Sequence, residues 1–256
     1  TSIGDYAFYD CTSLTSIVIP NRVRSIGDYA FSYCTSLTSI VIPESVRSIG
    51  SSAFSYCSSL TNVVIGDSVT SIGSYAFEDC TSLTSIYYKG TIGEWCNISF
   101  SNSNSNPMYY ADNFYMLDEN NEYYLVTEIV IPETVTLIGN YQFYGFVKIT
   151  SIEIPSSVTY IGDSAFAGCK SLTNVYYTGT VEDWCNISFS DSYSTPMYYA
   201  DNFYMLDENN EYYLVTEIVI PETVTSIGTY QFYGFMNVKD IILPNRVRSI
   251  GDYAFY

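Results

Sequence analysis

The sequence predicts a repeat solenoid, a β-rich α/β fold in which short coils stack one upon the next. An Ile-Gly pair returns at a fixed interval, each repeat contains one strand-like alternation of residues, and no linker interrupts this register. The interval is 23 residues, apart from two steps of 66. The pairs begin at Ile3, Ile26, Ile49, Ile72, Ile138, Ile161, Ile227 and Ile250.

The two long steps each hold one ordinary repeat and one repeat enlarged to 43 residues. The enlarged repeats cover residues 83–125 and 172–214, and they create a second period of 89 residues. Residues 107–136 and 196–225 are identical at all 30 positions. We therefore expect a single solenoid domain over residues 1–256. Because neither end resembles a polar capping repeat, we expect the chain to be a segment of a longer protein.

Each ordinary repeat begins with a short predicted strand. In residues 14–20, Ile17 and Ile19 point to the same side, and the strand stops at Pro20, which cannot donate to a ladder. A second, shorter extended piece follows and contains Ile26. Equivalent strands of neighbouring coils are expected to lie about 5 Å apart, so that stacking buries the apolar face that one coil cannot bury alone.

The rest of the repeat predicts a short helix. Gly27 turns the chain, and Asp28 then stands where a helix N-cap would accept amide protons. Behind it, Ala30, Phe31 and Cys34 have the spacing of one apolar stripe on a helix of one or two turns.

Five cysteines fall at one position of the repeat, which raises three alternatives: a metal site, a disulfide framework or a packed core. Phe146 and Phe235 fill the same position in two repeats, and phenylalanine can neither bind a metal nor form a disulfide. The chain also has no histidine and no CxxC pair. We therefore predict a ladder of buried thiols that behave as small apolar groups, with no metal or other cofactor. The ladder consists of Cys11, Cys34, Cys57, Cys80 and Cys169.

The enlarged repeats carry inserts with their own predicted elements. The sequences "TIGEW" and "TVEDW" predict a short Thr-capped helix around Trp95 and Trp184. The sequence "FYMLDENNEYYLV" predicts a protruding β-hairpin with its turn at residues 118–121 and a second strand that runs into the next repeat strand. The turn offers oxygens that Ca²⁺ would accept, but turns favour the same residues and the EF-hand spacing is absent, so a plain turn is preferred.

Charge and hydropathy exclude several classes of partner. The chain has nine basic residues against 27 acidic ones, a net charge of −18, which would repel the nucleic-acid backbone and anionic lipid. No apolar run approaches the roughly 18 residues needed to span a bilayer, so membrane insertion is not expected.

Residues 14–36 and 37–59 both match the pattern LxxIxIPxxVxxIGxxAFxxCxx in full. This pattern resembles the BspA-like leucine-rich repeats, also described from Treponema pallidum, and the resemblance covers over half of the chain. The enlarged repeats are similar to inserts in such proteins from gut Firmicutes. The resemblance implies a leucine-rich-repeat superhelix with a parallel sheet on its concave face. It also implies an exported, extracellular or cell-surface protein that binds host proteins, other cells or matrix.

The outward positions of the predicted sheet supply the candidate binding residues. Their carboxylates have two interpretations: an ordinary solvated face, or an acidic, tyrosine-bearing surface for a basic protein or for sugars stacked on the rings. The partner would then be a protein or glycan on host or neighbouring cells. The candidates are Tyr87, Glu128, Val130, Glu153, Tyr176, Glu217, Val219 and Asp240.

The favoured function is a surface adhesion or interaction module without catalysis. One alternative is an architectural stalk or a fibre unit that associates end to end. Another is a glycan-cleaving enzyme that uses two carboxylates, with Glu128 and Glu153 as the best pair. No histidine is present to act as a base, and no nucleophile-base pairing is visible, which disfavours the enzyme.

Overall fold

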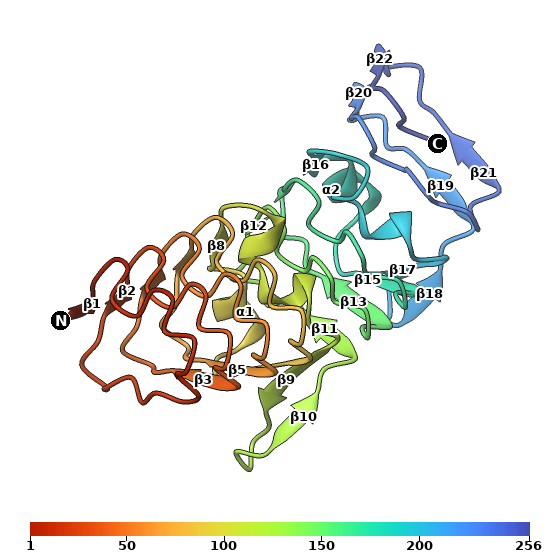
Figure 1. Cartoon of the computed structure of the whole chain (residues 1–256). Helices are drawn as coiled ribbons and strands as arrows, with labels where there is room; N and C mark the ends of the chain where they lie inside the picture. The colour runs from red at the N-terminus through yellow and green to blue at the C-terminus, as the bar shows by residue number, and fades with distance from the viewer. The chain divides into compact units, whose positions relative to one another are not determined.

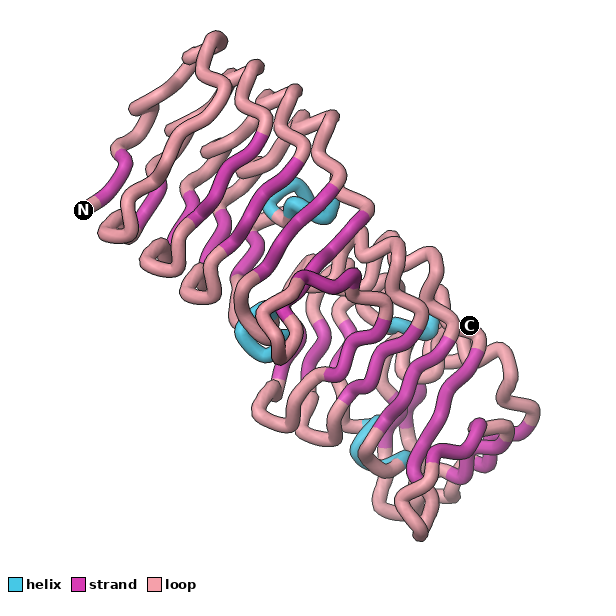
Figure 2. The backbone as a smooth tube through the Cα atoms, turned by 90° about the horizontal axis from the view of Figure 1, so that it is seen from below, coloured by secondary structure: helices cyan, strands magenta, loops and turns pink.

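The computed structural model describes all residues from Thr1 to Tyr256, and they form two compact units. Unit 1 consists of Thr1–Val126 with Asn140–Phe146, and unit 2 consists of Thr127–Gly139 with Val147–Tyr256. Each unit is a stack of short coils whose strands run side by side (Figures 1 and 2). The predicted solenoid is therefore confirmed, and the two units are described separately below.

Unit 1 contains two sheets built from successive coils. Its long sheet has strands β3 Ser39–Ile42, β5 Asn62–Ile65, β7 Ser85–Tyr88, β9 Asn113–Leu117 and β10 Tyr123–Leu125. Its short sheet has strands β1 Ser2–Ile3, β2 Ser25–Ile26, β4 Ser48–Ile49, β6 Ser71–Ile72 and β8 Ser99–Phe100. All pairs are parallel except β10 with β9. Ile40 pairs with Val63, which confirms the 23-residue register.

Unit 2 repeats this arrangement. Its long sheet has strands β11 Glu128–Val130, β13 Ser151–Ile154, β15 Asn174–Tyr177, β17 Asn202–Leu206 and β18 Tyr212–Leu214. Its short sheet has strands β12 Leu137–Ile138, β14 Tyr160–Ile161 and β16 Ser188–Phe189. Two further parallel pairs join β19 Glu217–Val219 to β21 Asp240–Ile242 and β20 Ser226–Ile227 to β22 Ser249–Ile250.

The predicted helix after the second strand is wrong, because this segment forms a ladder of turns. Tyr29 and Tyr33 have φ of 55° and 61°, which no α-helix allows. Alternate amides bond within the coil and to the next coil: Ser32 N donates to Tyr29 O at 3.2 Å, whereas Phe31 N donates to Ala53 O at 2.7 Å. The segment therefore pairs with its neighbours as a strand would, and no i→i−4 ladder can form.

Asp28 does not cap a helix either. Its carboxylate accepts from Ser51 N at 2.7 Å, and Asp28 N donates in turn to the Asp5 carboxylate at 2.9 Å. The side chain thus satisfies an amide of the following coil. The same residue preference that favours a helix N-cap also suits this link between coils.

The core is made of ladders of identical residues, as predicted. Phe8, Phe31, Phe54 and Phe77 stack with ring centroids 5.0, 5.3 and 5.5 Å apart. On the outside of the same turns, Tyr33 stacks on Tyr56 at 4.6 Å. Because each coil repeats the residue of the one before, one favourable ring contact is repeated along the stack.

The thiol ladder is also confirmed. Cys34, Cys57 and Cys80 are fully buried, and each Sγ donates to a phenylalanine carbonyl of the preceding coil at 3.2 Å. Burial raises the pKa of Cys34 to about 11 and that of Cys80 to about 12. Cys169 is fully buried as well, and Phe146 occupies the equivalent position with 1% exposure.

In the native protein at neutral pH, Cys34, Cys57 and Cys80 should resist modification by a thiol reagent, because burial keeps them protonated and inaccessible. All three should react after denaturation, while the half-buried Cys11 provides a more accessible reference in the same chain. Cys57→Ala should lower the free energy of unfolding by only about 1 kcal/mol. Rapid native labelling of Cys57, or stoichiometric bound zinc, would contradict the ladder.

The two Thr-capped helices of the inserts are confirmed as α1 Ile92–Trp95 and α2 Val181–Cys185. In each, a capping box joins the Thr to the acidic residue three positions later. Three short 3₁₀ turns complete the inserts: η1 Ser103–Ser105, η2 Pro107–Tyr109 and η3 Pro196–Tyr198. The helices place Trp95 and Trp184 in the core, where they are 0% and 1% exposed.

Each buried tryptophan is fixed by reciprocal hydrogen bonds. Trp95 Nε1 donates to the Gln142 carbonyl oxygen at 2.9 Å, and Gln142 Nε2 donates to the Trp95 carbonyl oxygen at 2.5 Å. Trp184 and Gln231 repeat the arrangement in unit 2. The inserts are therefore anchored in the core of each unit.

The predicted hairpins exist, but they are not appendages. β9 is antiparallel to β10 and also parallel to β7, with Ser85 opposite Asn113, so the first hairpin strand is a strand of the long sheet. Phe114 and Met116 of β9 are 2% and 6% exposed. The prediction that the second strand continues into the next repeat strand is wrong: β10 and β11 belong to different sheets.

The hairpin turn at residues 118–122 satisfies its own polar groups, which confirms a plain turn. The Asp118 carboxylate accepts from Asn120 N at 2.8 Å and from Glu122 N at 2.9 Å. The Glu122 amide is the main cause of a lowered Asp118 pKa. Asp207 makes the same contacts in the second hairpin.

Replacing residues 118–122 by a two-residue turn should leave unit 1 folded, because the turn makes its hydrogen bonds within itself and β9 keeps its pairing with β7. We expect a change in the free energy of unfolding of about 0.5 kcal/mol or less, measured by urea denaturation. Loss of cooperative unfolding would mean that the turn itself supports the core.

Candidate functional site

The outward face of the long sheet of unit 2 carries a continuous row of side chains. Reading across the strands, Val130 lies opposite Glu153, Glu153 opposite Tyr176, and Tyr176 opposite Tyr204. Residues of a strand alternate between faces, so the intervening Ile152 and Val175 are buried in the core. The row is held in register by the ladder behind it.

Three tyrosines of this face form a cluster, the tyrosine cluster of unit 2, consisting of Tyr176, Tyr204 and Tyr212. The ring of Tyr176 stacks on that of Tyr204, with centroids 4.8 Å apart and planes at 18°. The edge of Tyr212 meets Tyr176 at 4.9 Å and 64°. Tyr212 comes from β18, so the hairpin completes the cluster.

Carboxylates surround this cluster. Burial and contact of its hydroxyl with the Glu153 carboxylate raise the pKa of Tyr212. Burial also raises the pKa of Tyr176, and Tyr204 and Glu128 add to the shift. The neighbourhood thus carries negative charge that this part of the sheet does not neutralise.

A third carboxylate lies at the end of the same sheet. Thr178 Oγ1 donates to Glu133 Oε1 at 3.2 Å and accepts from Ser156 N at 3.0 Å. None of Glu128, Glu133 and Glu153 forms an ion pair. A positively charged group from outside the chain would find three acceptors here.

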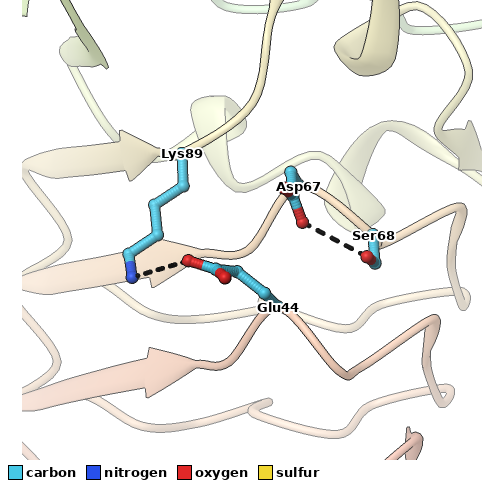
Figure 3. A network of polar contacts seen from close by, with 4 residues as sticks. All are labelled: Glu44, Asp67, Ser68 and Lys89. Carbon is cyan, nitrogen blue, oxygen red and sulfur yellow. Dashed lines mark hydrogen bonds and ion pairs between the residues drawn. The ribbon is translucent and has the colours of Figure 1, made fainter. Parts of the chain in front are cut away.

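Unit 1 has the equivalent tyrosine cluster of Tyr87, Tyr115 and Tyr123. Tyr87 stacks on Tyr115 at 4.8 Å and meets the edge of Tyr123 at 5.0 Å. In this unit, however, Lys89 Nζ forms an ion pair with Glu44 Oε1 at 3.2 Å (Figure 3). Burial raises the pKa of Tyr123, and the Lys89 ammonium opposes that shift, so the ammonium lies near the ring.

The remaining candidates lie on the separate pair β19 and β21. Glu217 stands directly opposite Asp240, and Val219 opposite Ile242. Both apolar side chains are exposed, Val219 by 56% and Ile242 by 51%. This small face carries two carboxylates but none of the clustered tyrosines.

The structure therefore divides the predicted site residues among three faces. Glu128, Val130, Glu153 and Tyr176 come together on one sheet, whereas Tyr87 lies in unit 1. Glu128 and Glu153 are out of register, because Glu128 lies opposite Ser151. The sequence analysis missed four tyrosines of the clusters, since it assigned the hairpin strands to protruding inserts: Tyr115, Tyr123, Tyr204 and Tyr212.

A family model, the BspA type leucine rich repeat region, matches the chain in six copies over residues 1–125, 120–209 and 209–256. The protein therefore belongs to the BspA-type leucine-rich-repeat family, as the sequence pattern indicates. No curated protein matches the sequence. No helix has the length and apolar character that crossing a membrane would require.

Solved structures similar to this chain are bacterial leucine-rich-repeat proteins. One from Bacteroides ovatus is 27% identical with a TM-score of 0.51, and the match covers 98% of this chain and 66% of that one. The chain thus spans just under two thirds of that relative. A leucine-rich-repeat protein of T. pallidum is 20% identical with a TM-score of 0.32, and the match covers 98% of this chain and 73% of that one.

Proposed function

We propose that this protein is a non-catalytic interaction module that binds a partner protein through the long sheet of unit 2. The observation that carries the proposal is the tyrosine cluster of unit 2 with its surrounding carboxylates Glu128, Glu133 and Glu153. Rings and charged acceptors are presented together there on a rigid sheet, with no ion pair inside the chain.

The composition of this face is typical of a binding surface. Tyrosine is enriched at the centres of protein interfaces because its ring buries a large apolar area and its hydroxyl still forms hydrogen bonds. Val130 adds an apolar side chain that is 60% exposed in the same row. We further propose that the protein acts outside the cell or at its surface, as the family resemblance implies.

The full chain should bind purified extracellular matrix proteins or intact cells, measured by biolayer interferometry and flow cytometry. Tyr176→Ala should weaken binding about tenfold, which is the loss expected for a central interface tyrosine. Tyr160→Ala is the matched control, since Tyr160 is exposed on the short sheet of the same unit and should leave binding unchanged. Binding that is insensitive to Tyr176 would contradict the proposal.

A glycan array and hydrolysis assays examine the alternative chemistry. Turnover of a glycan that is lost in Glu153→Gln would show that the module is an enzyme and would overturn the non-catalytic proposal. Glycan binding without turnover would replace the partner protein by a sugar ligand.

A further inference from the structure

We propose that the tyrosine cluster of unit 2 receives a lysine or arginine side chain from a basic segment of the partner protein. This inference rests on the proposed function and specifies the chemistry of the group that the sheet binds. It draws on an internal comparison, since unit 1 contains the same cluster with a cation already beside it.

The occupied cluster of unit 1 shows which group such a site accepts. There Lys89 follows β7, its ammonium pairs with Glu44 at 3.2 Å, and its charge reaches Tyr123 (Figure 3). The Lys89 side chain is 33% exposed, so the ammonium is partly withdrawn from water against the ring and the carboxylate. Ammonium groups are attracted both to tyrosine rings and to carboxylates.

The 89-residue period identifies the changes in unit 2. Thr178 replaces Lys89, while Glu133 keeps the carboxylate of Glu44. Glu153 replaces Val64 and adds a carboxylate that contacts Tyr212.

A further carboxylate appears where Glu128 replaces Ser39, although Ser156 removes the one at Asp67. Unit 2 has therefore lost the internal cation and holds three carboxylates at these positions, where unit 1 has two carboxylates and one ammonium.

The geometry favours a cation over a stacked sugar. Tyr204 covers one face of the Tyr176 ring and Tyr212 meets its edge, which reduces the flat ring surface that a sugar would use. The carboxylates add an attraction that a neutral sugar does not need. The occupant that satisfies both groups is a basic side chain of a protein.

The test uses the full chain and a fluorescein-labelled peptide of alternating lysine and glycine, followed by fluorescence anisotropy in about 0.15 M salt. Thr178→Lys restores the internal lysine of unit 1 and should weaken peptide binding about tenfold. Ser171→Lys adds the same charge at an exposed turn residue outside the cluster and should change affinity less than about twofold. A peptide with every lysine acetylated should not bind.

A second variant tests the converse in unit 1. Lys89→Thr combined with Val64→Glu copies the unit 2 arrangement, and it should raise the stoichiometry by one peptide per chain. Circular dichroism and thermal unfolding should show that each variant keeps its fold. A stoichiometry that does not rise in a folded double variant would count against the inference.

Equal weakening by Thr178→Lys and Ser171→Lys would overturn the inference, because binding would then reflect only the net charge of the chain. Absence of peptide binding would also overturn it. If partner-protein binding is nevertheless lost in Tyr176→Ala, the proposed function stands and only the basic occupant is wrong. Glycan binding that ignores Thr178→Lys would likewise exclude the basic occupant.

Discussion

Replacing Gly145 by alanine is expected to lower the free energy of unfolding of unit 1 by roughly 4 kcal/mol. Gly145 has φ of +77°, and a Cβ there would lie 2.1 Å from the Met108 carbonyl oxygen. Since this neighbour is backbone, it cannot rotate away, and the left-handed conformation adds its own cost for alanine.

Urea denaturation followed by circular dichroism measures this effect. Gly4→Ala is the matched control: a Cβ at Gly4 would meet nothing within 4 Å, so stability should hardly change. Gly234 repeats the contact in unit 2, with its Cβ position 2.1 Å from the Met197 carbonyl oxygen. A loss below about 1 kcal/mol for Gly145→Ala would show that the segment does not pack against η2 as described.

Trp95→Ala is expected to cost about 4 kcal/mol, the usual loss for a large buried aromatic residue. The indole is fully buried, lies 4.7 Å from the Phe114 ring and donates to the Gln142 carbonyl oxygen at 2.9 Å. Its removal leaves a cavity and an unsatisfied carbonyl in the core of the enlarged repeat.

Trp95→Phe separates these two losses. It keeps most of the ring but removes the indole donor, so we expect about 1.5 kcal/mol. Tyr124→Ala, at a side chain 46% exposed on β10, provides the control with little change. Equal stability of Trp95→Ala and the native chain would contradict an anchored insert.

The coil register was predictable because period and burial agree. Ile, Phe and Cys return every 23 residues, and identical residues that stack produce the Phe31–Phe54 contact at 5.3 Å without further information. The local conformation of the turns was not predictable in the same way. The spacing of Ala30, Phe31 and Cys34 suits a helix, but it also suits turns whose alternate amides bond to the next coil. Contacts between coils decide between the two.

The candidate site was only partly predictable for a similar reason. Glu153 and Tyr176 follow from strand alternation within ordinary repeats. Tyr204 was missed because Asn202, the start of its strand, pairs with Asn174 across 28 residues, and this interval does not follow the 23-residue period. The exchange of Lys89 for Thr178 is visible in the sequence through the 89-residue period. Its meaning required the ion pair of Lys89 with Glu44.

Hydrogen–deuterium exchange of the native full chain tests the central claim most directly: the enlarged repeats supply strands of the binding face. Peptides covering β17 Asn202–Leu206 should be protected as strongly as those covering β15, because β17 pairs with β15 on one side and with β18 on the other. The turn at residues 207–211 should exchange rapidly. If β17 exchanges as rapidly as that turn, the hairpin lies outside the sheet, and Tyr176 has no tyrosine cluster.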